Sequence, residues 1–167
     1  NGKETGTSVT LTPTGAGQAM TVSAGGTLTV TIDASSPTTA LLLDSSAEQT
    51  TGIFRLAANN TENLNVDSIK ITDEGTNGND VVASYKLYNG STLLSSLPAD
   101  GSGNVEFFLT SNQFVIPAND YKLITVKAVL NDIDGTGFVN GDTLITTIDI
   151  AGDVDTTGLA SGTAVDS

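Results

Sequence analysis

The chain contains no cysteine, no histidine and no tryptophan among its 167 residues. Without cysteine there is no disulfide framework and no thiol nucleophile, and without histidine the commonest general base near neutral pH is missing. The side chains left for chemistry are Asp, Glu, Tyr, Lys and Arg, in a background rich in Thr, Ser, Gly and Asn. That background favours strands and turns, so we expect a structural module and no enzyme.

Positive charge is also scarce, because 6 Lys and Arg face 19 Asp and Glu, a net charge of −13. Phosphate binding depends on clustered Lys and Arg, so we expect no nucleic-acid partner. No stretch approaches the roughly 18 apolar residues of a membrane span, so we expect no insertion into a membrane. An acidic surface suits solubility, cation binding and crowded surface lattices.

Apolar and polar residues alternate along much of the chain, as in a half-buried β-strand. Leu28, Val30 and Ile32 alternate with threonines, and similar rows occupy 81–87, 105–109 and 124–130. With turn residues between such rows and no helical pattern, the sequence predicts an all-β fold, an antiparallel two-sheet β-sandwich of about seven to nine strands. We expect these residues in its core: Leu28, Val30, Ile32, Phe107, Ile124, Val126 and Ile148.

Two local patterns refine this prediction. Asn89-Gly90 is a strong signal for a two-residue hairpin, because both residue types tolerate a positive φ. Between Val66 and Ile69 the alternation slips by one position. This slip predicts either a β-bulge or a strand that crosses from one sheet to the other.

The ends of the chain differ from its middle. We expect an N-terminal arm or junction over 1–24, a β-sandwich domain over 25–151, and a C-terminal tail or junction over 152–167. Thr14-Gly15-Ala16-Gly17 resembles Thr157-Gly158-Leu159-Ala160, about one sandwich domain further on, as expected if both ends join consecutive modules. Within the arm, Val9 and Leu11 form a short alternating strand pattern. It is suited either to pairing with an adjacent subunit or module, or to folding back onto the chain's own sheet.

Several segments together resemble the immunoglobulin-like repeats of large bacterial cell-surface proteins of the S-layer or stalk type. They are Gly26–Val30, Ile53–Glu62, Val66 with Ile69 and Ile71, Leu87–Thr92, Phe114–Ala118 and Tyr121–Val126. The resemblance implies an immunoglobulin-like sandwich, an extracellular or cell-surface location, and self-assembly with copies of the chain or adjacent modules into a layer, stalk or filament. The resemblance implies no catalytic residues.

One acidic segment is a candidate calcium loop. Counted from Asp132, oxygen side chains stand at positions 1, 3, 5 and 9 and a glycine at position 6, as calcium loops require. Position 12 is Thr143 and no helices flank the loop, so it is not an EF-hand. A loop site formed by Asp132, Asp134 and Asp142 is one interpretation, and a polar hairpin loop is the other. Asp73–Asp80 and the trio Asp149, Asp153 and Asp155 have suitable ligands without a diagnostic spacing.

The alternative function is an adhesin-like or carbohydrate-binding accessory module of a larger surface protein or enzyme. Tyr85 and Tyr88 stand an odd number of residues apart in one strand, so they are expected on opposite faces and form no aromatic platform. Glycoside hydrolysis needs two neighbouring carboxylates, and no feature of the sequence places any two of Glu62, Glu74 and Glu106 together. Asn59-Asn60-Thr61 and Asn89-Gly90-Ser91 match the N-glycosylation pattern, which makes glycans candidate partners.

Overall fold

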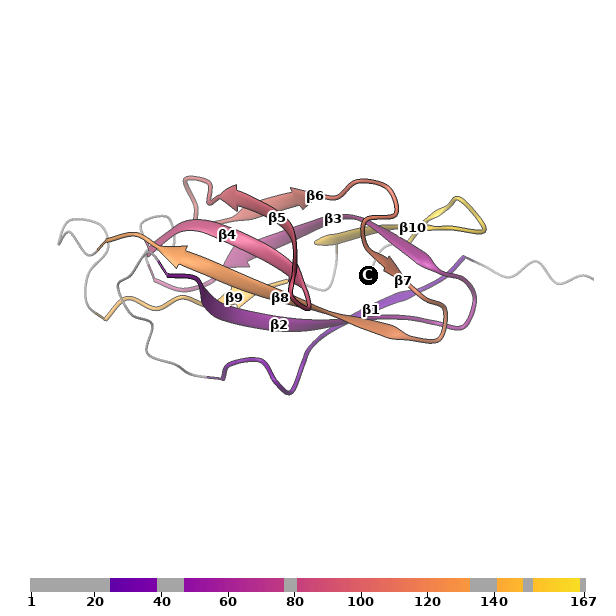
Figure 1. Cartoon of the computed structure of the whole chain (residues 1–167), viewed down its shortest axis with the longest axis horizontal. Coiled ribbons are helices and arrows are strands. Elements are labelled where there is room, and N and C mark those ends of the chain that lie inside the picture. Colours follow the sequence, from indigo (N-terminus) through magenta and orange to yellow (C-terminus); the bar gives the residue numbers. More distant parts are fainter. Residues whose placement is uncertain (1–24, 39–46, 77–80, 133–140, 149–151, 166–167) are drawn as a thin grey trace, which may run out of the picture.

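The computed structural model describes residues 25–38, 47–76, 81–132, 141–148 and 152–165. Within these ranges every secondary-structure element is a strand, and the strands form two packed antiparallel sheets (Figure 1). The predicted all-β sandwich is therefore confirmed. The described part of the chain contains eleven strands, more than expected, and three of them are only two residues long.

The first sheet has five strands. In spatial order they are β1 (Leu28–Ile32), β2 (Gln49–Ala58), β8 (Tyr121–Leu130), β4 (Val82–Asn89) and β5 (Thr92–Pro98). The sequence suits these positions, because Thr, Val, Ile and Tyr fill a pleated, half-buried surface well.

The second sheet has six strands. Four follow the order β11 (Ala164–Val165), β10 (Val154–Gly158), β3 (Leu64–Asp73) and β6 (Val105–Phe108); β7 (Val115–Ile116) and β9 (Thr146–Thr147) also pair with β3. In Figure 1 the ribbons of β3, β6 and β10 lie above those of β1, β2 and β8. Among the described residues no helix is long and apolar enough to cross a membrane.

The core lies between the sheets and is mainly aliphatic, with Tyr85, Phe107 and Phe114 as its largest fully buried side chains. Six of the seven expected core residues are buried: Leu28, Val30, Phe107, Ile124, Val126 and Ile148. The prediction for Ile32 is wrong, because its side chain is 69% exposed. Ile32 is the last residue of β1, which among the described strands pairs only with β2, and the chain then turns over 33–36. Alternation places a side chain on a face, but burial also needs a layer opposite it.

The phase slip in β3 is a β-bulge. Ser68 is paired with Asp155 and Val66 with Thr156, so Asp67 is left without a partner across the β3–β10 ladder. The extra residue lets Val66 and Ile69 both point into the core, where each is fully buried.

A two-residue hairpin forms at the predicted place, but its loop lies one residue further along the chain than the predicted pair Asn89-Gly90. Asn89 pairs with Thr92 across β4 and β5, so the two loop residues are Gly90 and Ser91. Gly90 has a φ of 58°, a left-handed conformation in which glycine has no steric penalty.

The sandwich extends beyond the boundary expected at residue 151. Strands β10 and β11 belong to the second sheet, so 154–165 are part of the sandwich and not a tail. The described chain begins beside this C-terminal hairpin: a Cβ built on Gly25 would lie 2.9 Å from Thr163 Oγ1 and 3.9 Å from Val165 Cγ2. The expected arm over 1–24, including Val9 and Leu11, lies outside the described residues.

Candidate functional site

The predicted calcium loop is only partly described. Asp132 is exposed just after β8, and the partly exposed Asp142 accepts a hydrogen bond from Thr76 Oγ1 at 3.4 Å. Asp134 lies outside the described residues. In the described ranges no three Asp or Glu residues are grouped to hold a metal ion. The three-carboxylate calcium site therefore stays a prediction.

This prediction is tested by thermal unfolding with and without calcium. If Asp132, Asp134 and Asp142 bind calcium, millimolar calcium raises the unfolding temperature, because a ligand that binds only the folded state stabilises it. A chelator reverses the increase, and the triple Asn variant does not show it. An unfolding temperature that responds to neither reagent assigns the three residues to turn formation.

Other acidic residues singled out in the sequence form hydrogen bonds that connect strands. Asp73 Oδ1 accepts hydrogen bonds from the backbone N–H of Gly75 at 2.7 Å and of Ile145 at 3.1 Å, which connects the end of β3 to the segment before β9. Asp155 Oδ2 accepts one from Ser68 Oγ at 2.8 Å, and Asp153 lies 3.5 Å from Lys70 Nζ. Asp149 and 77–80 lie outside the described residues.

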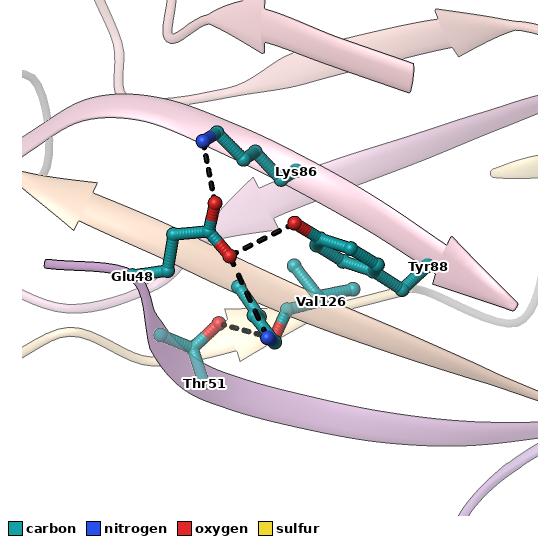
Figure 2. Close-up of polar contacts among 6 residues, drawn as sticks. Glu48, Thr51, Lys86, Tyr88 and Val126 are labelled. Atoms are coloured by element: carbon teal, nitrogen blue, oxygen red, sulfur yellow. Dashed lines mark hydrogen bonds and ion pairs between the residues drawn. The ribbon is translucent and has the colours of Figure 1, made fainter. Parts of the chain in front are cut away.

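A cluster of charged side chains lies on the outer face of the first sheet, and we call it the Glu48 cluster: Glu48, Lys86, Tyr88 and Lys127 (Figure 2). Glu48 precedes β2, and its Oε1 accepts a hydrogen bond from Lys86 Nζ at 2.6 Å. Its Oε2 accepts one from Tyr88 OH at 2.8 Å and lies 3.5 Å from Lys127 Nζ. Lys127 Nζ also stands 4.5 Å from the centre of the Tyr88 ring, a cation–π contact.

These contacts keep the cluster in one charge state near neutral pH. The hydrogen bond from Lys86, then that from Tyr88, lowers the pKa of Glu48 to about 2. The same carboxylate raises the pKa of Lys86 and of Tyr88. Glu48 is therefore an anion and a poor proton donor at neutral pH. With two ammonium groups against one carboxylate, the cluster presents a surplus positive charge to a negatively charged partner.

The two tyrosines of β4 point to opposite faces, as predicted. Tyr88 lies in the outer cluster, whereas Tyr85 is fully buried between the sheets. Burial, with a further contribution from Asp73, raises the pKa of Tyr85 above its usual value. No sugar-stacking platform results from this pair.

A second basic site lies on the same outer face. The guanidinium carbon of Arg55 stands 4.0 Å from the centre of the Tyr121 ring, whose residue is 46% exposed. The two side chains help to line a shallow hollow of about 390 Å³, together with Ala57, Ala58, Asn119 and Asp120. This hollow and the Glu48 cluster make the outer face of the first sheet the candidate recognition surface.

Sequence reasoning missed this surface for a topological reason. Arg55, Lys86 and Lys127 stand at polar positions of alternating rows, so each could be assigned to an outer face from sequence alone. Their strands become neighbours only through the order β2-β8-β4, in which Lys86 is paired directly with Lys127. Nothing in the sequence indicated that order.

A different carboxylate holds the ends of the described chain together. Glu62 is 6% exposed, and its Oε1 accepts hydrogen bonds from Gly26 N at 3.0 Å and Ser161 Oγ at 2.8 Å. Its Oε2 accepts hydrogen bonds from Ala160 N and Ser161 N, both at 2.9 Å. These bonds, those from Ser161 foremost, lower the pKa of Glu62 to about 2. The carboxylate thus connects the start of the sandwich to the β10–β11 turn.

The two glycosylation patterns begin at Asn59 and Asn89. The side-chain oxygen of Asn59 accepts a hydrogen bond from Thr61 N at 3.0 Å, and Asn89 is the last residue of β4, at the hairpin. Glycans at these positions stay a prediction.

No family model, no curated protein and no solved structure matches this chain. The function of the chain is therefore inferred from its sequence and from the geometry described above.

Proposed function

We propose that this chain is a non-enzymatic extracellular structural module, a subunit or repeat of a surface layer, stalk or filament. It assembles with copies of itself or with adjacent modules by strand donation. Support comes from the two-sheet sandwich, from the excess of acidic residues that suits a crowded lattice, and from the resemblance to bacterial surface repeats.

The observation that carries this proposal is where the chain enters the sandwich. Gly25, the first residue that the structure describes, lies against Thr163 and Val165, beside edge strand β11. Among the described strands β11 pairs only with β10, which leaves its other edge without a described partner. An incoming strand forms ladder hydrogen bonds with such an edge whatever its side chains are.

Strand donation also explains the alternation in the arm. A strand added to the edge of a sheet turns every second side chain toward the core, and Val9 and Leu11 are spaced for this. Exchange of an identical element between copies is an economical route to assembly, because each copy supplies one arm and receives one.

The test is to delete residues 1–14. We expect the shortened chain to fold to the same β-rich state and to remain monomeric, whereas the full chain forms polymers. Electron microscopy and sedimentation measure assembly, and a far-UV spectrum measures folding.

A matched pair of variants separates pairing from a general effect of the arm. Val9→Asn with Leu11→Asn is expected to prevent assembly, and Thr10→Asn with Thr12→Asn is expected to preserve it. Normal polymers from the deleted chain would mean that the modules join through other surfaces.

A further inference from the structure

The two outer faces of the sandwich carry opposite charge. We call the outer face of the first sheet the basic face. Its described strands present the cations Arg55, Lys86 and Lys127 and no carboxylate. Glu48 lies just before β2, beside Lys86 and Lys127. Asp33 and Asp120 follow or precede its strands and lie at its rim.

The outer face of the second sheet, the acidic face, has the reverse composition. Its one cation, Lys70, is paired with Glu106 across β3 and β6 and lies 3.5 Å from Asp153. Asp155 is bonded to Ser68 on the same face, and Asp67 accepts a hydrogen bond from Thr157 Oγ1 at 2.6 Å. Four carboxylates against one ammonium group give this described face a net charge of −3.

Each face also exposes apolar surface. On the acidic face Phe108 is 72% exposed; it is paired with Ser68 of β3, and Asp155 is paired with Ser68 from the other side of that strand. On the basic face Tyr121 is 46% exposed beside Arg55. Aromatic and arginine side chains are the usual anchors of protein interfaces, so both faces carry an anchor next to charge.

We propose that the acidic face of one copy docks on the basic face of a second copy. This inference rests on the proposed function and adds to it a specific surface and a specific partner. Contact between two identical faces places like charges together, whereas acidic-to-basic contact pairs opposite charges. Because the two faces differ and lie on opposite sides of the sandwich, the contact is head-to-tail, and it repeats from copy to copy as a stack or filament.

The size of the faces indicates a weak contact. Strands of ten residues, such as β2 and β8, are about 33 Å long, and five strands span about 19 Å. The basic face therefore offers roughly 600 Å². The acidic face offers less, because β6, β10 and β11 are only four, five and two residues long, so the two faces together bury less than about 1,200 Å², the size of weak and transient interfaces. An interface of this size with charged partners is expected to weaken as salt is added.

Charge-reversed full-length variants test the proposal. One variant carries Glu106→Lys and Asp155→Lys on the acidic face, and the other carries Arg55→Glu and Lys127→Glu on the basic face. Each variant alone is expected to raise the protein concentration needed for assembly at least about tenfold, measured by light scattering and sedimentation in low salt. The control is Glu74→Lys, which makes the charge change of the single substitution Glu106→Lys past the end of β3 and is expected to assemble normally.

Mixing the two variants is the decisive measurement. In an equimolar mixture the unchanged basic face of one variant meets the unchanged acidic face of the other, and the two reversed faces also match. We expect assembly to return in the mixture and in neither variant alone. If a double variant does not fold, Glu106→Lys and Arg55→Glu as single changes at exposed positions provide the same comparison.

The outcomes separate this inference from the proposed function. Assembly of each reversed variant at the same concentration as the unmodified chain overturns face-to-face docking and leaves strand donation standing. Loss of assembly in both variants without recovery in the mixture also overturns it. If the unmodified chain stays monomeric at every concentration and salt, both the docking and the proposed function are wrong.

Discussion

Replacement of Glu62 by glutamine is expected to lower the unfolding temperature by several degrees, more than the same change at an exposed carboxylate. Glu62 uses both oxygens, and each accepts two hydrogen bonds. Glutamine has the same shape but only one oxygen, so its NH₂ group must face two donors. The buried donors around Gly26 and Ser161 are then left without an acceptor.

The effect depends on pH in a defined direction. The pKa of Glu62 is about 2 in the folded protein, below its ordinary value of 4.5. A lowered folded-state pKa means that the carboxylate stabilises the fold above pH 4.5 and that this contribution is lost between pH 4.5 and 2. The difference in unfolding temperature between the native chain and Glu62→Gln is therefore constant above about pH 5 and shrinks toward pH 2.

The measurement is thermal unfolding at pH 7, 4 and 2.5 for the native chain, Glu62→Gln and the control Glu74→Gln. Glu74 is exposed, so its change is expected to have little effect at any of these pH values. If Glu62→Gln and Glu74→Gln unfold at the same temperature at pH 7, the cluster around Glu62 does not stabilise the fold.

Replacement of Gly75 by alanine is expected to destabilise the protein by about 2–5 kcal/mol. A Cβ on Gly75 would overlap the backbone oxygen of Thr143, and backbone cannot move aside as a flexible side chain can. The same Thr143 oxygen accepts a hydrogen bond from Thr76 N at 2.9 Å, and Ile145 N donates to Asp73 nearby. The added methyl group therefore separates the end of β3 from the segment before β9.

Gly101→Ala is the matched control, because a Cβ there meets no atom within 4 Å. Its expected effect is neutral or slightly stabilising, since alanine restricts the unfolded chain. Chemical denaturation of the two variants gives the comparison. Equal stability for Gly75→Ala and the native chain would show that the segment around Thr143 yields easily and contributes little to the fold.

The layers of the sandwich were predictable from single rows of residues. Alternation in 28–32, 105–109 and 124–130 identified strands and their buried faces, because side chains in a strand point to opposite sides. The slip between Val66 and Ile69 indicated either a bulge or a strand that crosses between sheets, and the pairing of β3 with β10 decided for the bulge. The inferences from sequence use only neighbours in the chain.

Strands with weak local patterns were missed. The described β5 has mostly exposed or half-exposed side chains, and β10 was assigned to a tail because its Asp-, Thr- and Gly-rich sequence lacks alternating large apolar residues. Both depend on partners distant in the sequence: β10 pairs with β3, about 90 residues earlier. For the same reason the Glu62 cluster was not predicted, because its acceptor and most of its donors are separated by about 100 residues.

The sequence alone determined the fold class, most of the core, and where an irregular strand and a hairpin occur, because these depend on the order of apolar, polar and turn residues along the chain. Only the tertiary structure decided which strands are neighbours. That order brings Lys86 beside Lys127 and Asp155 beside Ser68, and so gathers a few cations on one face and carboxylates on the other. The composition of an acidic chain predicts the sign of its net charge. The distribution of that charge over two faces arises only when strands from distant segments pair.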